Sequence, residues 1–388
     1  MKPTNSILSA YETSVFEVMS RLAREHKAVN LGQGFPDTNG PDDVRRVAVQ
    51  ATEEGPNQYP PSPGLPELRQ AVARHDKRFY GLDLDWEREV IVTCGGTEAL
   101  ASCFFGLIEP GDEVVLFQPL YDAYLPLVLR AGGVPKLVRL KPPDWRFDEE
   151  MLSRAFSPRT RVVLFNNPLN PTATVYGEDQ LSLLAHFCMA NNSIIVCDEV
   201  WEHVVFDGRR HISMFAVPGM RSRTVKIGSA GKIFSLTGWK VGFVCAAPEI
   251  LRVLAKAHQY ITFTTPPNLQ TAVTYGLGKD DSYFEEMRRD LARSRDRFTK
   301  GLKQIGFPVL ESQGTYFVSV DLAPLGLNID DESFCKRLVA EHKVAAIPVS
   351  AFYAEDPVKS VVRFCFAKKD ATLDGALERL AGALRGRI

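Results

Sequence analysis

Short apolar runs alternate with longer helix-like segments along most of the chain, and this alternation constrains the fold more than any other feature. The runs are rich in β-branched residues and nearly uninterrupted, as expected for strands buried on both faces of a sheet. Strands that alternate with helices are typical of a mostly parallel sheet covered by helices. Seven runs are predicted as strands: residues 89–93, 113–117, 136–140, 161–166, 193–198, 224–229 and 241–246.

This order predicts two structural units. Residues 45–280 hold all seven runs and are expected to form a large α/β domain around the seven-stranded sheet. Residues 281–388 begin with a long charged helix that carries an apolar stripe, and they continue with three strand candidates, the middle one at 344–349. We expect them to form a smaller α+β domain, completed by an N-terminal arm of residues 1–44.

The charge balance argues against a protein that binds nucleic acid. Lysine and arginine total 46 against 47 acidic residues, which gives a net charge of −1 and no basic patch. The seven cysteines show no CxxC spacing and mostly lie in apolar runs, so we expect reduced, buried thiols and no metal site. The N-terminus becomes polar too early for a signal peptide, and no apolar run approaches the length of a membrane span. We therefore expect a cytoplasmic protein without a membrane partner.

Polar residues at strand ends receive the most weight, because ligands of open parallel sheets bind beyond the carboxyl ends of the strands. After the first run, Gly96 and Thr97 belong to a glycine turn that opens a helix, and such a turn can bind an anion. After the fourth run, two prolines stiffen the segment around Asn170, which could donate to a ligand oxygen. A helix entry without a ligand and an ordinary capped turn remain the alternatives.

Two further strand ends carry groups of stronger chemistry. Asp198 ends an apolar run, where a carboxylate is costly unless it meets a cation; a helix cap or a structural ion pair is the alternative. Ser229 ends another run, and Lys232 follows among small residues, either as a solvated lysine or as a nucleophile, with Lys240 beyond it. Together the four strand ends offer an anion site, a hydroxyl partner, an acid and an amine, which is a set that suits pyridoxal phosphate.

Motifs with this order and spacing extend over almost the whole chain. They are NLGQGFPD, NQYPPSPGLPELRQAVA, GGTEAL, NNPLNPTA, DEVWEHVVFDG, GSAGKIFSLTGWKVGF, GTYF and VVRFCFA. In these motifs the chain resembles the fold type I, class I and II pyridoxal-phosphate-dependent aminotransferases. It looks most similar to the branch that contains methionine, glutamine and kynurenine aminotransferases.

The resemblance implies a role for each cofactor-binding residue. Lys232 would hold the cofactor covalently and move a proton during the reaction. Asp198 would pair with the ring nitrogen and keep it protonated. Asn170 would donate to the phenolate oxygen, and Tyr121 would stack on the ring, although it could be an ordinary core aromatic. The phosphate would be held by Ser229, Lys240, the backbone of Gly96 and Thr97, and Tyr59 from a neighbouring subunit.

The role of Tyr59 implies a homodimer with shared active sites; a plain turn tyrosine is the alternative. Arg363 would clamp the substrate carboxylate with two parallel hydrogen bonds, and the backbone N–H of Gly34 would bind the same group. Phe16, Tyr121 and Phe263 would line the side-chain pocket beside Asn170, and no arginine aligns with a second carboxylate.

We therefore expect amino transfer from a neutral, apolar or aromatic L-amino acid, such as methionine, glutamine, phenylalanine or kynurenine, to a 2-oxo acid. Carbon–sulfur β-elimination on cysteine conjugates or cystathionine uses the same lysine and is an alternative. A non-catalytic binding or regulatory protein is the other, although Lys232 is present.

Two positions depart from the family's usual pattern. Trp201 stands where tyrosine is common, and an indole can donate a hydrogen bond but cannot accept one. Ala173 stands where glycine is common, which predicts that this backbone position does not need a positive φ.

Overall fold

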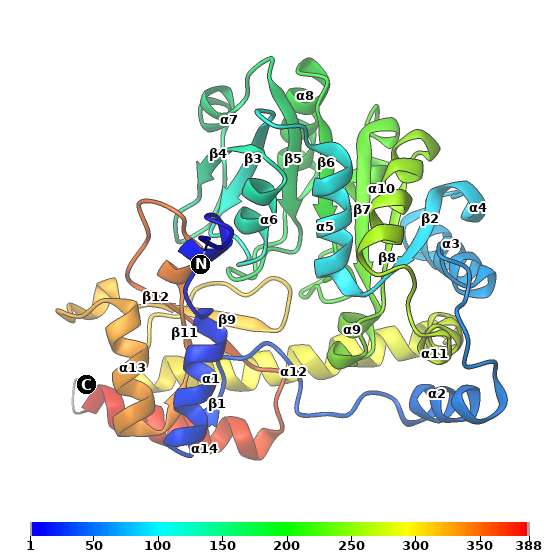
Figure 1. Ribbon diagram of the computed structural model, residues 1–388. Coiled ribbons are helices and arrows are strands. Elements are labelled where there is room, and N and C mark those ends of the chain that lie inside the picture. The colour runs from blue at the N-terminus through cyan, green and yellow to red at the C-terminus, as the bar shows by residue number, and fades with distance from the viewer. Residues whose placement is uncertain (1, 386–388) are drawn as a thin grey trace.

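The computed structural model describes residues 2–385 and contains a large mixed sheet with a smaller sheet beside it (Figure 1). The strands are β1 Val29–Asn30, β2 Val90–Thr93, β3 Glu113–Gln118, β4 Val134–Arg139, β5 Thr160–Asn166, β6 Ile194–Asp198, β7 Thr224–Ser229, β8 Gly242–Ala246, β9 Phe317–Asp321, β10 Val344–Ala345, β11 Ile347–Pro348 and β12 Val361–Cys365. The helices are α1 Val15–Glu25, α2 Asp42–Glu54, α3 Pro66–Tyr80, α4 Trp86–Glu89, α5 Gly95–Leu107, α6 Tyr124–Arg130, α7 Glu149–Ala155, α8 Glu178–Ala190, α9 Ala230–Ile233, α10 Pro248–Ile261, α11 Pro267–Leu277, α12 Asp281–Ile305, α13 Asp331–His342 and α14 Asp370–Arg385.

The large sheet has seven strands in the order β2-β8-β7-β6-β5-β3-β4, and each corresponds to one predicted run. The strands from β7 to β4 pair in parallel, whereas β8 is antiparallel to both β7 and β2. The prediction of a mostly parallel sheet is therefore confirmed. The antiparallel edge was not predicted, because apolar content alone does not reveal the direction of a strand.

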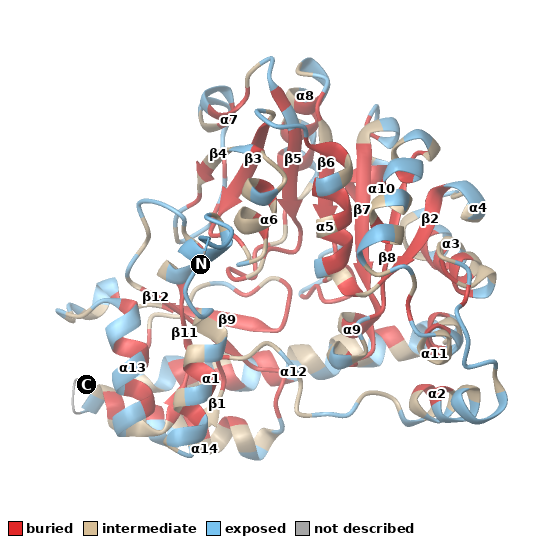
Figure 2. Cartoon of the chain, in the orientation of Figure 1, coloured by how far each residue is buried: buried red, intermediate tan, exposed pale blue. Residues whose placement is uncertain are grey.

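Alternate residues of the buried strands serve opposite faces of this sheet. In β5, Val162 and Leu164 pack into the core beneath α5, α6 and α10, while Val163 and Phe165 pack into the core beneath α7 and α8. The strands are consequently buried on both sides, and exposure is concentrated on the outer faces of the helices (Figure 2). Two apolar faces explain why the strand sequences lack a polar alternation.

The smaller sheet has the antiparallel order β11-β12-β9, and β1 pairs in parallel with β10 nearby, with Val29 opposite Val344. Both chain ends therefore contribute to this part of the molecule, as predicted. The candidate strand 344–349 is instead two short strands, because the chain pairs first with β1 and then with β12.

The long helix α12 connects the two parts, and in Figure 1 it runs below the large sheet and above α14. Near its start, Phe284 packs into a core shared with β2 and β8, and later Phe298 and Leu302 pack into the core of the smaller sheet. The predicted boundary at 44/45 falls inside α2, and that at 280/281 immediately precedes α12. These domain boundaries stay a prediction. Within residues 2–385, no helix combines the length and apolar character needed to cross a membrane.

Candidate active site

A cavity of about 230 Å³ lies at the carboxyl ends of the central strands, where α5 and α9 begin. This is the edge at which open parallel sheets bind ligands. Nine residues singled out from the sequence line the cavity: Gly96, Thr97, Tyr121, Asn170, Asp198, Trp201, Ser229, Lys232 and Lys240.

Lys232 lies in the single turn of α9, directly after β7, and its side chain is half-buried. Its Nζ donates to the hydroxyl of Tyr316 at 3.0 Å and lies 4.5 Å from the centre of the Trp201 ring. Burial lowers the pKa of this amine from 10.5 to about 8, and the nearby cations Arg363 and Lys240 act in the same direction. The amine is therefore easily made neutral, the form in which lysine is nucleophilic.

Asp198 ends β6, and its carboxylate is buried among other side chains. The hydroxyl of Tyr124 donates to Oδ2 at 2.6 Å, and the backbone N–H of Val200 faces Oδ1 at 3.4 Å. Burial raises the pKa of the carboxyl group in spite of these donors. Among the described residues Asp198 has no ion-pair partner, so a cationic group in the cavity would relieve the cost of burying it.

The opposite end of the cavity suits an anion. Helix α5 begins here at Gly95, whose φ of +79° favours glycine, and Gly96 and Thr97 form the first turn. The first-turn N–H groups of a helix lack partners within it and attract negative charge. The amine of Lys240 lies against this turn, because a Cβ placed on Gly95 would stand 3.2 Å from Nζ. Ser229 lines the same end of the cavity.

Arg363 reaches the site from β12 of the smaller sheet and is almost fully buried. Its Nη1 donates to Oδ1 of Asn170 at 2.8 Å, and its Nη2 donates to the carbonyl of Gly32 at 2.7 Å. The ring centre of Phe317 lies 3.9 Å from the guanidinium carbon of Arg363, and the ring centre of Phe16 lies 5.4 Å from it. Burial lowers the pKa of Arg363 to about 10, which leaves it charged at neutral pH and in need of an anion.

Four other predicted residues, Gly34, Phe16, Tyr59 and Phe263, are not among those that line the cavity. The carbonyl of Gly34 accepts a 2.6 Å hydrogen bond from Tyr316, and Phe16 packs near Tyr121 with ring centres 6.5 Å apart. Tyr59 and Phe263 pack edge to face at 5.3 Å and are 83% and 42% exposed, so in a single chain they face solvent.

Sequence reasoning missed three positioning residues. Tyr124 binds Asp198, and Tyr316 links Lys232 to the carbonyl of Gly34. Asn166 accepts from the N–H of Asn170 at 2.8 Å and donates to the carbonyl of Asp198 at 2.7 Å, so it fixes one site residue against another. Asn166 and Tyr316 stand inside motifs quoted from the sequence, and Tyr124 lies three residues after Tyr121. Their contacts join residues 4 to 282 positions apart.

The prediction for Ala173 is wrong: its φ is +64°, in the left-handed region. Its N–H donates to the carbonyl of Leu169, and its own carbonyl accepts from Gln313 and Gly314 at 2.9 and 3.0 Å. These contacts hold the turn around Asn170 in a conformation that alanine tolerates at a cost. Trp201 is buried edge-on against Tyr316 at 4.3 Å, where its ring forms a wall beside the Lys232 amine.

These features fit pyridoxal phosphate on physical grounds. The buried Asp198 carboxylate calls for a cationic nitrogen, the α5 terminus with Lys240 suits a phosphate, and the Lys232 amine is prepared for an aldehyde. The three groups line one cavity.

Comparison with known proteins agrees with this geometry. The family model for aminotransferases of class I and II matches residues 26–380. The solved N-succinyldiaminopimelate aminotransferase of Mycobacterium tuberculosis superposes with a TM-score of 0.95 at 44% identity, covering 98% of this chain and 100% of that one.

Two curated relatives act on other amino acids. The methionine aminotransferase of Escherichia coli is 38% identical over 368 residues, which cover 95% of each chain. Human kynurenine–oxoglutarate transaminase 1 is 35% identical over 397 residues, covering 93% of each chain. The chain belongs to the class I and II aminotransferases, the pyridoxal-phosphate-dependent enzymes that transaminate amino acids.

Proposed function

We propose that this enzyme transfers the amino group of a neutral, apolar or aromatic L-amino acid, of the methionine, glutamine, phenylalanine or kynurenine type, to a 2-oxo acid. The observation that carries the proposal is the charge of the site. Arg363, which is hydrogen-bonded to Asn170, would bind one carboxylate. The described residues that line the cavity include no arginine that could bind a second one. A second carboxylate would lose its hydration without gaining a guanidinium partner.

Each cofactor contact is assigned to a residue of this chain. The first turn of α5, Ser229 and Lys240 would hold the phosphate, Asp198 the ring nitrogen and Asn170 the phenolate oxygen. Tyr121 would cover one face of the ring. The bound cofactor supplies an electron sink for the charge that develops on the substrate α-carbon.

Lys232 is proposed as the covalent anchor and as the base that moves the α-proton. A lowered pKa suits both tasks, since the amine must lose and regain a proton near neutral pH. The Tyr316 hydroxyl, 3.0 Å away, would orient the amine when it is free. Arg363, Asn170 and the N–H of Gly34 would fix the substrate carboxylate, and with it the direction of the α-hydrogen.

The substrate side chain would lie beside Phe16 and Tyr121, which already pack near each other and near Arg363. Phe263, exposed in the single chain, would join this pocket when a second subunit covers it. The protein would then act as a homodimer, with Tyr59 reaching the phosphate in the neighbouring site. Exposed aromatic residues at 59, 260 and 263 support such an interface. Seven free cysteines, six of them buried, support a reducing, cytoplasmic location.

A second candidate substrate follows from similarity. The relative from Mycobacterium tuberculosis is titled an N-succinyldiaminopimelate aminotransferase, and that substrate carries carboxylates beyond the α-position. It would need cations from outside the described cavity, such as those of a second subunit.

A panel of amino donors with 2-oxoglutarate as acceptor tests the proposal, with formation of each donor's oxo acid measured as kcat/KM. Methionine, phenylalanine and kynurenine should be good donors, because burying an apolar side chain contributes roughly 1.5 to 3 kcal/mol. Glutamine should also serve, because its side chain is uncharged, whereas aspartate should be poor because its second carboxylate would be desolvated without a partner. Arg363→Lys should weaken every donor, since a lysine cannot form the two parallel bonds, whereas Phe263→Ala should weaken mainly the aromatic donors.

Two further additions separate the alternatives. N-succinyldiaminopimelate as the fastest donor would replace the proposed substrate class while leaving the chemistry intact. Pyruvate released from a cysteine conjugate in the absence of an acceptor would identify a carbon–sulfur lyase. Aspartate as the fastest donor would contradict the proposed pocket.

A further inference from the structure

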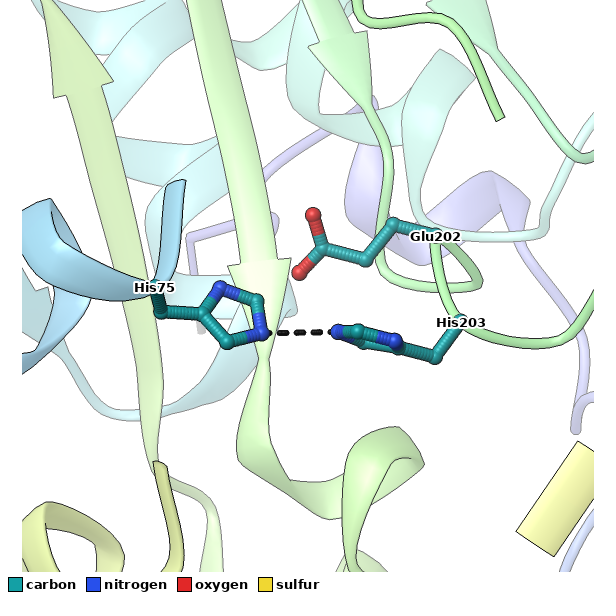
Figure 3. Close-up of side chains that lie close together, drawn as sticks. All are labelled: His75, Glu202 and His203. Carbon is teal, nitrogen blue, oxygen red and sulfur yellow. Dashed lines mark hydrogen bonds between the residues drawn. The ribbon is translucent and has the colours of Figure 1, made fainter. Parts of the chain in front are cut away.

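A second group of buried, chemically active side chains lies outside the cavity. His75 comes from α3, and Glu202 and His203 come from the segment that follows β6 (Figure 3). The two imidazoles point toward each other with their Nε2 atoms 2.7 Å apart, and the Glu202 carboxylate faces the same space. Each residue offers one ligand atom within 4.8 Å of the other two, and all three are at most 2% exposed.

The carboxylate of Glu202 is only partly satisfied. Its Oε2 lies 2.7 Å from the amine of Lys226, which also lies 2.7 Å from Oδ1 of Asp76. Neither of its oxygens makes a hydrogen bond within residues 2–385, and Oε1 lacks even an ion-pair partner there. One ammonium group thus faces two carboxylates, and a buried negative charge remains that a bound cation would offset.

The facing Nε2 atoms of the two histidines share one proton, which a bound metal ion would displace. Nδ1 of His75 lies 3.4 Å from Oδ1 of Asp76, and a carboxylate there favours the proton on Nδ1, which leaves the Nε2 lone pair free. Burial, and then the neighbouring His75, place the pKa of His203 well below its ordinary value, so this ring is neutral. His203 is then the donor of the 2.7 Å hydrogen bond between the two rings, and binding an ion through its Nε2 would release that proton or move it to Nδ1. A neutral imidazole with a carboxylate behind it is typical of metal sites.

An ion could reach this group from outside. A cleft of about 530 Å³ is bordered by Tyr80, Glu202 and His203. The hydroxyl of Tyr80, which also borders the cleft, lies 3.4 Å from Nε2 of His203. A solvent molecule could therefore complete a coordination shell that the protein leaves open on this side.

We propose that His75, His203 and Glu202 bind one zinc-class transition-metal ion, through the two Nε2 atoms and Oε1. Two imidazoles and one carboxylate are a common ligand set for zinc. Nitrogen atoms at about 2.0 to 2.1 Å from a tetrahedral ion stand roughly 3.3 Å apart, so the rings would separate by about half an ångström. Sequence reasoning expected no metal site. The three ligands were not recognised, since residue 75 is far in the sequence from residues 202 and 203.

The site would tie α3 to the segment that carries Asp198, four residues before Glu202. It would act on stability, not on the reaction itself, and it does not depend on the proposed substrate. Binding to the folded state alone would raise the midpoint of thermal unfolding as free zinc increases.

The test uses holoenzyme without a histidine tag, loaded with zinc and freed of excess ion. We expect about one zinc per chain by elemental analysis, and an X-ray absorption signal of nitrogen and oxygen neighbours at about 2.0 to 2.1 Å. His203→Gln and His75→Gln should each reduce zinc affinity at least tenfold in competition with a chromogenic chelator. They should also remove the zinc-dependent increase in the unfolding midpoint.

His258→Gln is the matched control, because His258 is equally buried and paired with Glu98 at 3.1 Å in another part of the fold. This variant should keep the zinc. A wild-type protein that retains no zinc, or sulfur neighbours at about 2.3 Å from a cysteine site, would overturn the proposal. So would equal zinc binding by His203→Gln and wild type, and the cofactor content of each variant reports whether it has folded.

Discussion

At the scale of single residues, the lysines of this chain differ mainly in what surrounds their amines. Lys226 is fully buried between Asp76 and Glu202, which hold it charged and raise its pKa. Lys240 lies against the start of α5. Lys232 faces a tyrosine hydroxyl and an aromatic ring, with no carboxylate in contact, so of the three it is the one whose amine is prepared to react.

This difference predicts where the cofactor is attached. Borohydride reduction of the holoenzyme, followed by peptide mapping, should find the cofactor on Lys232, and recovery on Lys226 or Lys240 would contradict the assignment. Because the pKa of Lys232 falls from 10.5 to about 8, the neutral amine predominates above that lower value. When apoenzyme is mixed with cofactor and the product is trapped with borohydride, the rate of covalent attachment should therefore increase as the pH rises to about 8 and become constant above that pH.

Substitutions of Asp198 and of its hydrogen-bond donor Tyr124 should reduce activity by different amounts. Asp198→Ala should raise the barrier by about 3 kcal/mol or more, because it removes the charge opposite the ring nitrogen. Tyr124→Phe removes only a hydrogen bond to that charge and should cost about 1.5 kcal/mol, measured as kcat/KM. Tyr353→Phe, which loses a hydroxyl bonded to the carbonyl of Leu140, is the control and should stay near wild type. Equal losses for Tyr124→Phe and Tyr353→Phe would contradict the positioning role.

At the scale of elements, the turn between β5 and α8 holds Asn170 in place while one of its residues, Ala173, adopts a strained backbone conformation. Ala173 holds a φ of +64° there, and its carbonyl receives two N–H groups from the segment before β9. The left-handed region costs an alanine about 1 to 2 kcal/mol, part of which glycine would recover.

Ala173→Gly should therefore stabilise the protein by about 0.5 to 1 kcal/mol, after the greater freedom of glycine in the unfolded chain is subtracted. Ala73→Gly, at a half-buried position inside α3, should instead destabilise it by about 1 kcal/mol. Unfolding midpoints at fixed protein and cofactor concentration compare the two variants. A lower midpoint for Ala173→Gly would show that strain at this residue is not significant.

At the scale of the whole molecule, one chain supplies most of the proposed site but leaves Tyr59 in solvent, packed on Phe263. The proposed symmetric dimer, in which each Tyr59 would serve the other cavity, would account for this exposure.

Subunit hybrids test that arrangement. Tyr59→Ala and Lys232→Ala homodimers should each be nearly inactive, and mixing them should restore activity, because one site in every hybrid retains both residues. Activity should approach one wild-type site per hybrid dimer, with each parent re-equilibrated alone as the control. Hybrids that form but stay inactive would mean that Tyr59 serves its own subunit or neither.

Much of this protein could be predicted from sequence because its signals are local. Uninterrupted β-branched runs fixed all seven strands of the large sheet, since a strand buried on both faces admits few polar residues. The carboxyl ends of parallel strands meet at one edge of the sheet, so residues at or after those ends come together. Nine of the residues predicted from the sequence line one cavity there. The family resemblance singled out Lys232 as the reactive lysine, and that role stays a prediction.

Only the tertiary structure decided what depends on contacts between distant segments. The reversed direction of β8, the hydrogen bond from Lys232 to Tyr316 and the strained backbone at Ala173 are fixed by partners far along the chain. The convergence of His75 on Glu202 and His203 is of the same kind. Sequence patterns report which face a residue occupies, whereas the pKa of an amine or the φ of an alanine depends on the particular neighbours that packing brings to it.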